Sequence, residues 1–134
     1  MEADEPHMIL FDTNVIIDMS NNPENAAWDI YSKEPAAVCG ITITELYRGF
    51  RNDREKEKIE RLLSGFQIIP IEQNDWKEAG LLIAELRNSG VTVPFQDAII
   101  AYLAIKNNCA VLTSDRHFKL IKACDERLQL MLNI

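Results

Sequence analysis

The sequence lacks a long uninterrupted apolar run. The longest, 98-AIIAYLAI-105, falls far short of the roughly 20 apolar residues that cross a bilayer as a helix. The first residues, 1-MEADEPH-7, are acidic where a secretory signal would be basic. We therefore expect no membrane association, no secretory leader and a cytoplasmic location.

Cysteine and glycine are also scarce. The three cysteines, at positions 39, 109 and 124, are odd in number and form no CxxC pair, which argues against a disulfide framework and against a zinc site. The five glycines form neither GxxxxGK nor GxGxxG. The sequence therefore carries no P-loop and no dinucleotide-binding fingerprint.

Basic residues are outnumbered by acidic ones. The 14 Lys and Arg residues against 21 Asp and Glu residues give a formal charge of -7, which disfavours binding to a phosphate backbone. Two bound divalent cations would add four positive charges and reduce the excess to -3. The placement of the charge then matters more than its sum.

The length and the apolar content fit one globular domain. With 134 residues, 47% of them hydrophobic, the chain can bury a core of its own but is short for two domains. We expect a single domain over residues 1–134, of which residues 1–7 form a flexible N-terminal extension.

Apolar runs rich in β-branched residues alternate with segments of helical period. Strands are predicted at residues 8–12, 36–41, 67–71 and 109–114, and a fifth at 128–132. Helices are predicted over residues 53–66, 76–90 and 94–108, the last apolar nearly all round. Such alternation predicts βαβ units, a mostly parallel sheet and helices on both of its faces.

Two of these helices carry more specific predictions. In the segment 76–90, Trp76, Ala79, Ile83 and Leu86 form one apolar stripe, and Gly90 is suited to the C-terminal cap. A further helix that contains Glu45 begins after the strand at 36–41, where Thr42 or Thr44 could cap it.

Four acidic residues stand where the predicted strands end or the predicted helices begin. Asp12 and Asp115 follow strands, while Glu45 and Asp97 lie in the first turns of helices. Ligands of open α/β sheets bind beyond the carboxyl ends of the strands, so the four carboxylates are expected to converge. Because like charges raise one another's pKa, such a cluster calls for a divalent cation, and oxygen ligands suit Mg²⁺ or Mn²⁺. A site of this kind can hydrolyse a phosphodiester bond.

Each acid also has a purely structural interpretation. Asp12 could cap a helix that starts near Thr13, and Asp97 could interact with a helix dipole. Glu45 could be a solvated helix residue, and Asp115 a turn residue after a strand. A different functional class is also open, a receiver-like domain in which Asp12 accepts a phosphoryl group. That class would need an acidic pair after the first strand and a Lys after a late one, and neither 12-DTN-14 nor 113-TSD-115 supplies them.

Four segments resemble the PIN-domain family, and in particular its VapC-like ribonuclease toxins. They are 10-LFDTNVII-17, 42-TITELYRG-49, 96-QDAIIAYLA-104 and 112-LTSDRHF-118. The resemblance covers nearly the whole chain and implies a three-layer α/β/α domain with a mostly parallel five-stranded sheet. It also implies a Mg²⁺ or Mn²⁺ site whose catalytic and metal-binding residues are Asp12, Glu45, Asp97 and Asp115. The same resemblance assigns supporting hydrogen bonds to Thr13, Asn14 and Thr113.

The resemblance also implies partners. Proteins of this kind cleave RNA, form homodimers and are held inactive by a VapB-type antitoxin, so RNA, an antitoxin and a second copy are the expected partners. Candidate RNA contacts are Arg48, Arg51 and Arg116. His117 stands where many relatives carry another acid, and we interpret it as an ordinary surface residue outside the site. The alternative to a nuclease is a non-catalytic PIN-like binding protein or a receiver-like phosphoacceptor.

Overall fold

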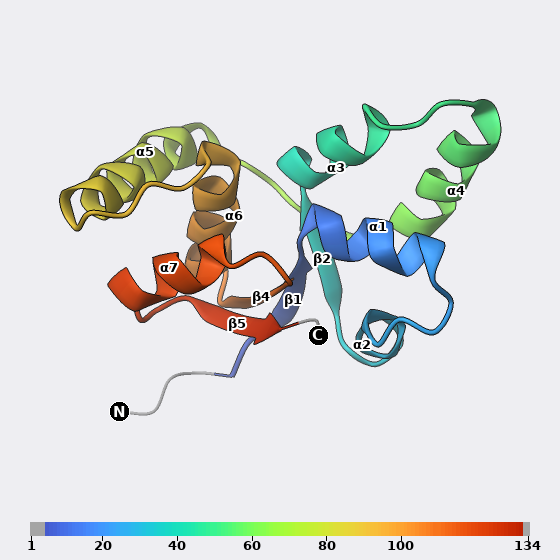
Figure 1. Ribbon diagram of the computed structural model, residues 1–134, viewed down its shortest axis with the longest axis horizontal. Coiled ribbons are helices and arrows are strands. Elements are labelled where there is room, and N and C mark those ends of the chain that lie inside the picture. Colours follow the sequence, from blue (N-terminus) through green and yellow to red (C-terminus); the bar gives the residue numbers. More distant parts are fainter. Residues whose placement is uncertain (1–4, 133–134) are drawn as a thin grey trace.

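The computed structural model describes residues 5–132, which form seven helices and five strands (Figure 1). In chain order these are β1 (Met8–Phe11), α1 (Thr13–Asn21), α2 (Ala27–Lys33), β2 (Ala36–Cys39), α3 (Gly40–Tyr47), α4 (Asp53–Leu63), β3 (Gln67–Ile69), α5 (Gln73–Asn88), α6 (Phe95–Lys106), β4 (Cys109–Thr113), α7 (His117–Cys124) and β5 (Gln129–Leu132).

The five strands form one sheet in the order β3-β2-β1-β4-β5. Every neighbouring pair is parallel, which confirms the predicted sheet. All carboxyl ends therefore meet at one edge. From β1 the sheet grows to one side through β2 and β3 and then to the other side through β4 and β5. The topological switch point, where ligands of such sheets bind, therefore lies between β1 and β4. This order differs from the 2-1-3-4-5 order of receiver domains.

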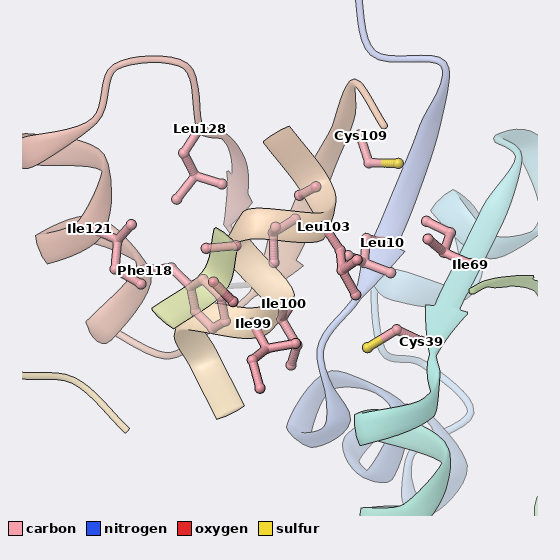
Figure 2. Packing of buried hydrophobic residues seen from close by; sticks show 14 of the residues in the cluster. Leu10, Cys39, Ile69, Ile99, Ile100, Leu103, Cys109, Phe118, Ile121 and Leu128 are labelled. Carbon is pink, nitrogen blue, oxygen red and sulfur yellow. The ribbon is translucent and has the colours of Figure 1, made fainter. Parts of the chain in front are cut away.

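Side chains of alternate residues in the strands enter two separate cores, because successive side chains of a strand point to opposite faces. Leu10 belongs to the core beneath α5, α6 and α7, whereas Ile9 and Phe11 belong to the core beneath α1 to α4. The two groups of helices lie on opposite sides of the sheet (Figure 1). Figure 2 shows part of the first core, where Leu10 of the sheet packs with Leu103 and Phe118 of the helices. The fold is the expected three-layer α/β/α arrangement.

Helix α6 confirms the prediction of a helix packed on several sides. Six of its residues are buried: Ala98, Ile99, Ile100, Ala101, Leu103 and Ala104. Pro94 is its N-cap, and Asp97 is in its first turn as predicted. This places a carboxylate at the start of a helix that is fixed to the sheet.

The apolar stripe predicted for α5 is confirmed in part, because Ala79 and Leu86 are buried and Ile83 is half-buried, but Trp76 does not belong to it. Trp76 is 53% exposed, and the buried residues are Asp75, Ala79, Leu82 and Leu86. The polar Asp75 is tolerated inside because Lys106 Nζ donates to it at 2.9 Å and Glu72 N at 2.8 Å. The helix ends as predicted, since Gly90 has a φ of 82° and Val91 N donates to Leu86 O at 2.8 Å, a Schellman cap.

Several predicted boundaries move. The strand at 36–41 ends at Cys39, because α3 begins directly at Gly40. Neither Thr42 nor Thr44 caps α3: the N-cap is Cys39, and Thr44 Oγ1 donates to Gly40 O instead. The strand at 67–71 ends at Ile69, and the helix at 53–66 ends at Leu63. Helices α2 and α7 were not predicted, and α7 contributes a residue to the cleft described below.

The N-terminal segment meets the amino end of the sheet. Residues 1–4 of the expected extension lie outside the described range. His7 N donates to Asn108 O at 2.8 Å, and Asn108 Nδ2 donates to Glu5 O at 2.9 Å. Over residues 5–132, no helix combines the length and the apolar character needed to cross a membrane.

Candidate active site

Four carboxylates from four separate segments line one cleft at the carboxyl edge of the sheet. Asp12 directly follows β1, Asp115 follows β4, Glu45 comes from α3 and Asp97 from the first turn of α6. The cleft has a volume of about 180 Å³. The convergence expected from the sequence is therefore observed.

Thr113 joins the two sides of the switch point. It is fully buried at the end of β4, and its hydroxyl donates to Asp12 Oδ2 at 2.9 Å. The Thr113 hydroxyl oxygen, Oγ1, in turn accepts a hydrogen bond from Asp115 N, also at 2.9 Å. One threonine thus positions the carboxylate of β1 and the loop that carries Asp115.

Asp12 is both a helix cap and a residue of the cleft. Its Oδ1 accepts from Thr13 N at 2.8 Å, and it is the N-cap of α1. Only 5% of the residue is exposed. Burial raises the pKa of this carboxyl, and the hydrogen bonds from Thr113 and Thr13 oppose that rise, while the charges of Asp115 and Glu45 add to it. Asp12 therefore caps α1, as its structural interpretation expects, and the same residue lines the cleft.

Glu45 is oriented by Thr13. The Thr13 hydroxyl donates to Glu45 Oε1 at 2.9 Å, so α1 supplies one residue that holds the acid of α3. The other carboxylate oxygen, Oε2, lies 3.9 Å from Arg48 Nη2. Since the Arg48 side chain is 74% exposed, this ion pair is loose and leaves Glu45 available at the mouth of the cleft.

Asp97 and Asp115 lie on either side of His117. The ring nitrogen Nδ1 of His117 is 3.1 Å from Asp97 Oδ2 and 3.0 Å from Asp115 Oδ1. Burial raises the pKa of Asp97 to about 6, and the negative charges of Asp115 and Asp12 contribute, while His117 opposes the rise. His117 therefore offsets only part of the unfavourable effect that burial and the neighbouring carboxylates have on the charge of Asp97.

The position of His117 corrects its interpretation as an ordinary surface residue. It is the first residue of α7, lines the cleft and contacts two of the four acids. Sequence patterns offered little indication of this position, because α7 was not predicted. Two hints were available: the resemblance, which places another acid at this position in many relatives, and the spacing in 115-DRH-117, which lets a residue two positions after Asp115 turn back toward it.

The remaining predicted residues divide into two groups. Thr13 and Thr113 make the hydrogen bonds described above, and Asn14 lines the cleft while exposed. The three arginines Arg48, Arg51 and Arg116 are exposed, and within the described part of the chain the lining of the cleft includes none of them. Arg51 instead lines an adjacent groove.

The donors of the cleft fit a divalent cation. Carboxylate oxygens are the usual ligands of Mg²⁺ and Mn²⁺. Ligand atoms of Asp97, Asp115 and His117 all lie within 4.8 Å of one another, a span that one ion can bridge. Burial, and to a smaller extent the negative charges of Asp115 and Asp12, raises the pKa of Asp97, and a bound cation would lower it.

Fold and cleft together define a class: a parallel α/β/α domain with an acidic site at the switch point of its sheet. The family model described as PIN domain matches residues 9–123, and the chain belongs to this family. The chain is 33% identical to the plasmid stability protein StbB of Pseudomonas syringae pv. tomato, with 81% of the chain and 88% of the relative covered.

Solved structures share the fold at lower identity. DNA-bound VapBC from Salmonella typhimurium includes a chain with a TM-score of 0.82 and 21% identity, covering 95% of this chain and 98% of that one. VapBC2 from Rickettsia felis, bound to a DNA fragment from its promoter, gives a TM-score of 0.78 at 22% identity, covering 92% and 97%. At these identities the likeness concerns the fold.

Proposed function

We propose that the protein is a metal-dependent endoribonuclease and the toxin of a VapBC-type toxin–antitoxin pair. The observation that carries this proposal is the cleft at the switch point, lined by Asp12, Glu45, Asp97 and Asp115. Membership of the PIN domain family and the likeness to the plasmid stability protein StbB support it.

The four acids are the proposed ligands of Mg²⁺ or Mn²⁺. When bound, the ion would supply an activated water and stabilise the leaving oxygen of an in-line displacement. The residues of the chain supply the geometry. Thr113 and the amide of Thr13 hold Asp12 through both of its oxygens, and the Thr13 hydroxyl fixes Glu45. Hydrogen bonds of this kind orient ligands and tune their basicity.

RNA is the proposed substrate, and exposed cations beside the cleft are its proposed contacts. Arg48, the C-cap of α3, is one turn from Glu45, and Arg116 directly follows Asp115. Arg51 lies at the adjacent groove. Contacts from such side chains to phosphates would position a strand without reading its sequence.

A VapB-type antitoxin is the proposed inhibitor, and a groove next to the cleft supports it. The groove, of about 400 Å³, is lined by residues of α1, α3 and α4, including Ile16, Leu46 and Leu62. Glu45 lines both the groove and the cleft. A peptide segment bound in the groove could therefore reach the acids. We also propose a homodimer, as the resemblance to VapC-like toxins implies, and a cytoplasmic location, as expected for a toxin that acts on cellular RNA.

The test is cleavage of single-stranded RNA by the purified chain, free of any other protein. Cleavage should require Mg²⁺ or Mn²⁺ and stop with a chelator. Asp12→Asn should reduce cleavage at least about 100-fold with an unchanged circular dichroism spectrum, since an asparagine keeps the shape but removes the charge that binds the ion. Asp29→Asn is the matched control, because Asp29 is a 69% exposed acid on α2. Equal cleavage by wild type and Asp12→Asn would indicate a contaminating nuclease.

The alternatives make a different prediction. A receiver-like domain would be labelled at Asp12 by a small phosphodonor, yet its strands would follow the order 2-1-3-4-5, whereas the order here is β3-β2-β1-β4-β5. A non-catalytic binding protein would bind its partner but would cleave no RNA with either metal. The same cleavage assay and a labelling assay separate these classes.

A further inference from the structure

Within the described chain, the ionisable side chains that line the cleft are four carboxylates and one imidazole, that of His117. A single ring nitrogen, Nδ1, faces both neighbouring acids, at 3.1 Å from Asp97 Oδ2 and 3.0 Å from Asp115 Oδ1. The ring is one-third exposed, since 34% of the side chain is accessible. It thus lies at the wall of the cleft with one nitrogen directed at the acids.

We propose that His117 is a direct metal ligand through Nδ1, together with Asp97 and Asp115, and that it makes the site favour Mn²⁺ over Mg²⁺. This inference rests on the metal site of the proposed function. It adds His117 to the four proposed acidic ligands. It also means that the preference for Mn²⁺ over Mg²⁺ depends on this one side chain.

The distances fit a shared ion. An octahedral ion with bonds of about 2.1 Å places adjacent ligand atoms roughly 3 Å apart. The two separations between Nδ1 and the carboxylate oxygens, 3.0 and 3.1 Å, match that edge. All three ligand atoms lie within 4.8 Å of one another. The three side chains therefore already have the spacing that ligation requires.

The local backbone holds this arrangement. His117 N donates to Asp115 Oδ1 at 2.9 Å, and Asp115 N donates to Thr113 Oγ1 at 2.9 Å. Asp97 is fixed separately by the first turn of the buried helix α6. The ligands thus come from α6, from the loop between β4 and α7, and from the first residue of α7, and these hydrogen bonds already hold Asp115 and His117 together before an ion enters.

The identity of the donor determines the preference among metals. Carboxylates suit both ions, but Mg²⁺ strongly favours oxygen ligands and dehydrates reluctantly, whereas Mn²⁺, the weakest-binding member of the first-row transition series, accepts an imidazole nitrogen more readily than Mg²⁺ does. A site that pairs two carboxylates with one imidazole should therefore bind Mn²⁺ more tightly than an all-oxygen site of equal charge would. The rival account is that His117 only pairs with the acids in the metal-free protein and moves aside when the ion binds.

Pulsed electron paramagnetic resonance of the Mn²⁺-loaded, untagged protein distinguishes the two accounts. The chain has two histidines, His7 at the opposite end of the sheet and His117 in the cleft. A directly bound imidazole should give a ¹⁴N coupling that changes when histidine is labelled with ¹⁵N, without any substitution in the protein. His117→Asn should abolish the coupling, and the matched His7→Asn should leave it unchanged.

Calorimetry gives the second readout. His117→Asn should weaken Mn²⁺ binding at least about tenfold but change Mg²⁺ binding less than about threefold, since an amide oxygen near the position of Nδ1 suits Mg²⁺. Mn²⁺ binding with no histidine coupling in the wild type would overturn the ligation while leaving the four-acid nuclease site intact. Failure of both metals to bind the wild type would overturn the proposed function as well.

Discussion

Replacement of Asp97 by asparagine should stabilise the metal-free protein at neutral pH. The pKa of Asp97 rises from 3.8 to about 6 because of burial and of the negative charges of Asp115 and Asp12. The folded state therefore binds the proton more tightly than the unfolded state does. For this group, stability is highest below about pH 4, falls as the pH rises toward 6, and is constant above that.

The magnitude follows from the pKa. A rise from 3.8 to about 6 corresponds to at most about 3 kcal/mol, and since 14% of the side chain is exposed, we expect about 1–3 kcal/mol. Asparagine is neutral at every pH, so Asp97→Asn should remove this cost. The variant should exceed the wild type in free energy of unfolding at pH 7.5 and lose most of that advantage at pH 4.

Urea denaturation in chelator at the two pH values measures the difference. Asp29→Asn, at an exposed position, is the control and should change stability little at either pH. Addition of Mn²⁺ at pH 7.5 should reverse the order, because ligand binding stabilises only the form that binds it. A variant less stable than wild type in chelator at pH 7.5 would refute the reasoning, since the Asp97 carboxylate would then be well compensated.

Further predictions concern Thr113 and two glycines. Thr113→Val removes the donor to Asp12 Oδ2 and should lower RNA cleavage about 10–100-fold with the fold retained. Thr113→Ser keeps a hydroxyl and should retain most of the activity. Equal activity of the wild type and both variants would exclude the positioning role. Gly65→Ala should cost about 1–3 kcal/mol in urea denaturation, because its Cβ would clash with the hydroxyl of Tyr31. Gly80→Ala, with nothing within 4 Å of the new Cβ, should instead stabilise helix α5 by about 1 kcal/mol, and a loss there would contradict the account of both positions.

The sequence predicted most of the sheet because the relevant signals are local. Strands rich in β-branched residues and the fully apolar segment at 98–105 have few alternatives to burial between layers, and the structure confirms both. The placement of Asp12 and Asp115 at the same edge of the sheet could be predicted equally well, since both residues follow strands and parallel strands end at one edge. Membership of the PIN domain family agrees with this part of the analysis.

Features that depend on contacts between residues distant in sequence were harder to predict. The burial of Asp75, which shifts the inner face of α5 away from Trp76, depends on Lys106, 31 residues further along the chain. The cap of α3 differed from the prediction because Cys39 leads from β2 directly into the helix. Local propensity cannot anticipate a partner that only the fold brings close.

The sequence by itself determined a parallel α/β domain with acids at the ends of its strands, since alternation of apolar segments and the position of charges are written along the chain. Only the tertiary structure decided the strand order, the switch point between β1 and β4, and the place of His117 against Asp97 and Asp115. The physical reason is that these contacts join segments up to about 100 residues apart, as Thr113 and Asp12 show, and their geometry is fixed by packing of helices on the sheet rather than by neighbours in sequence.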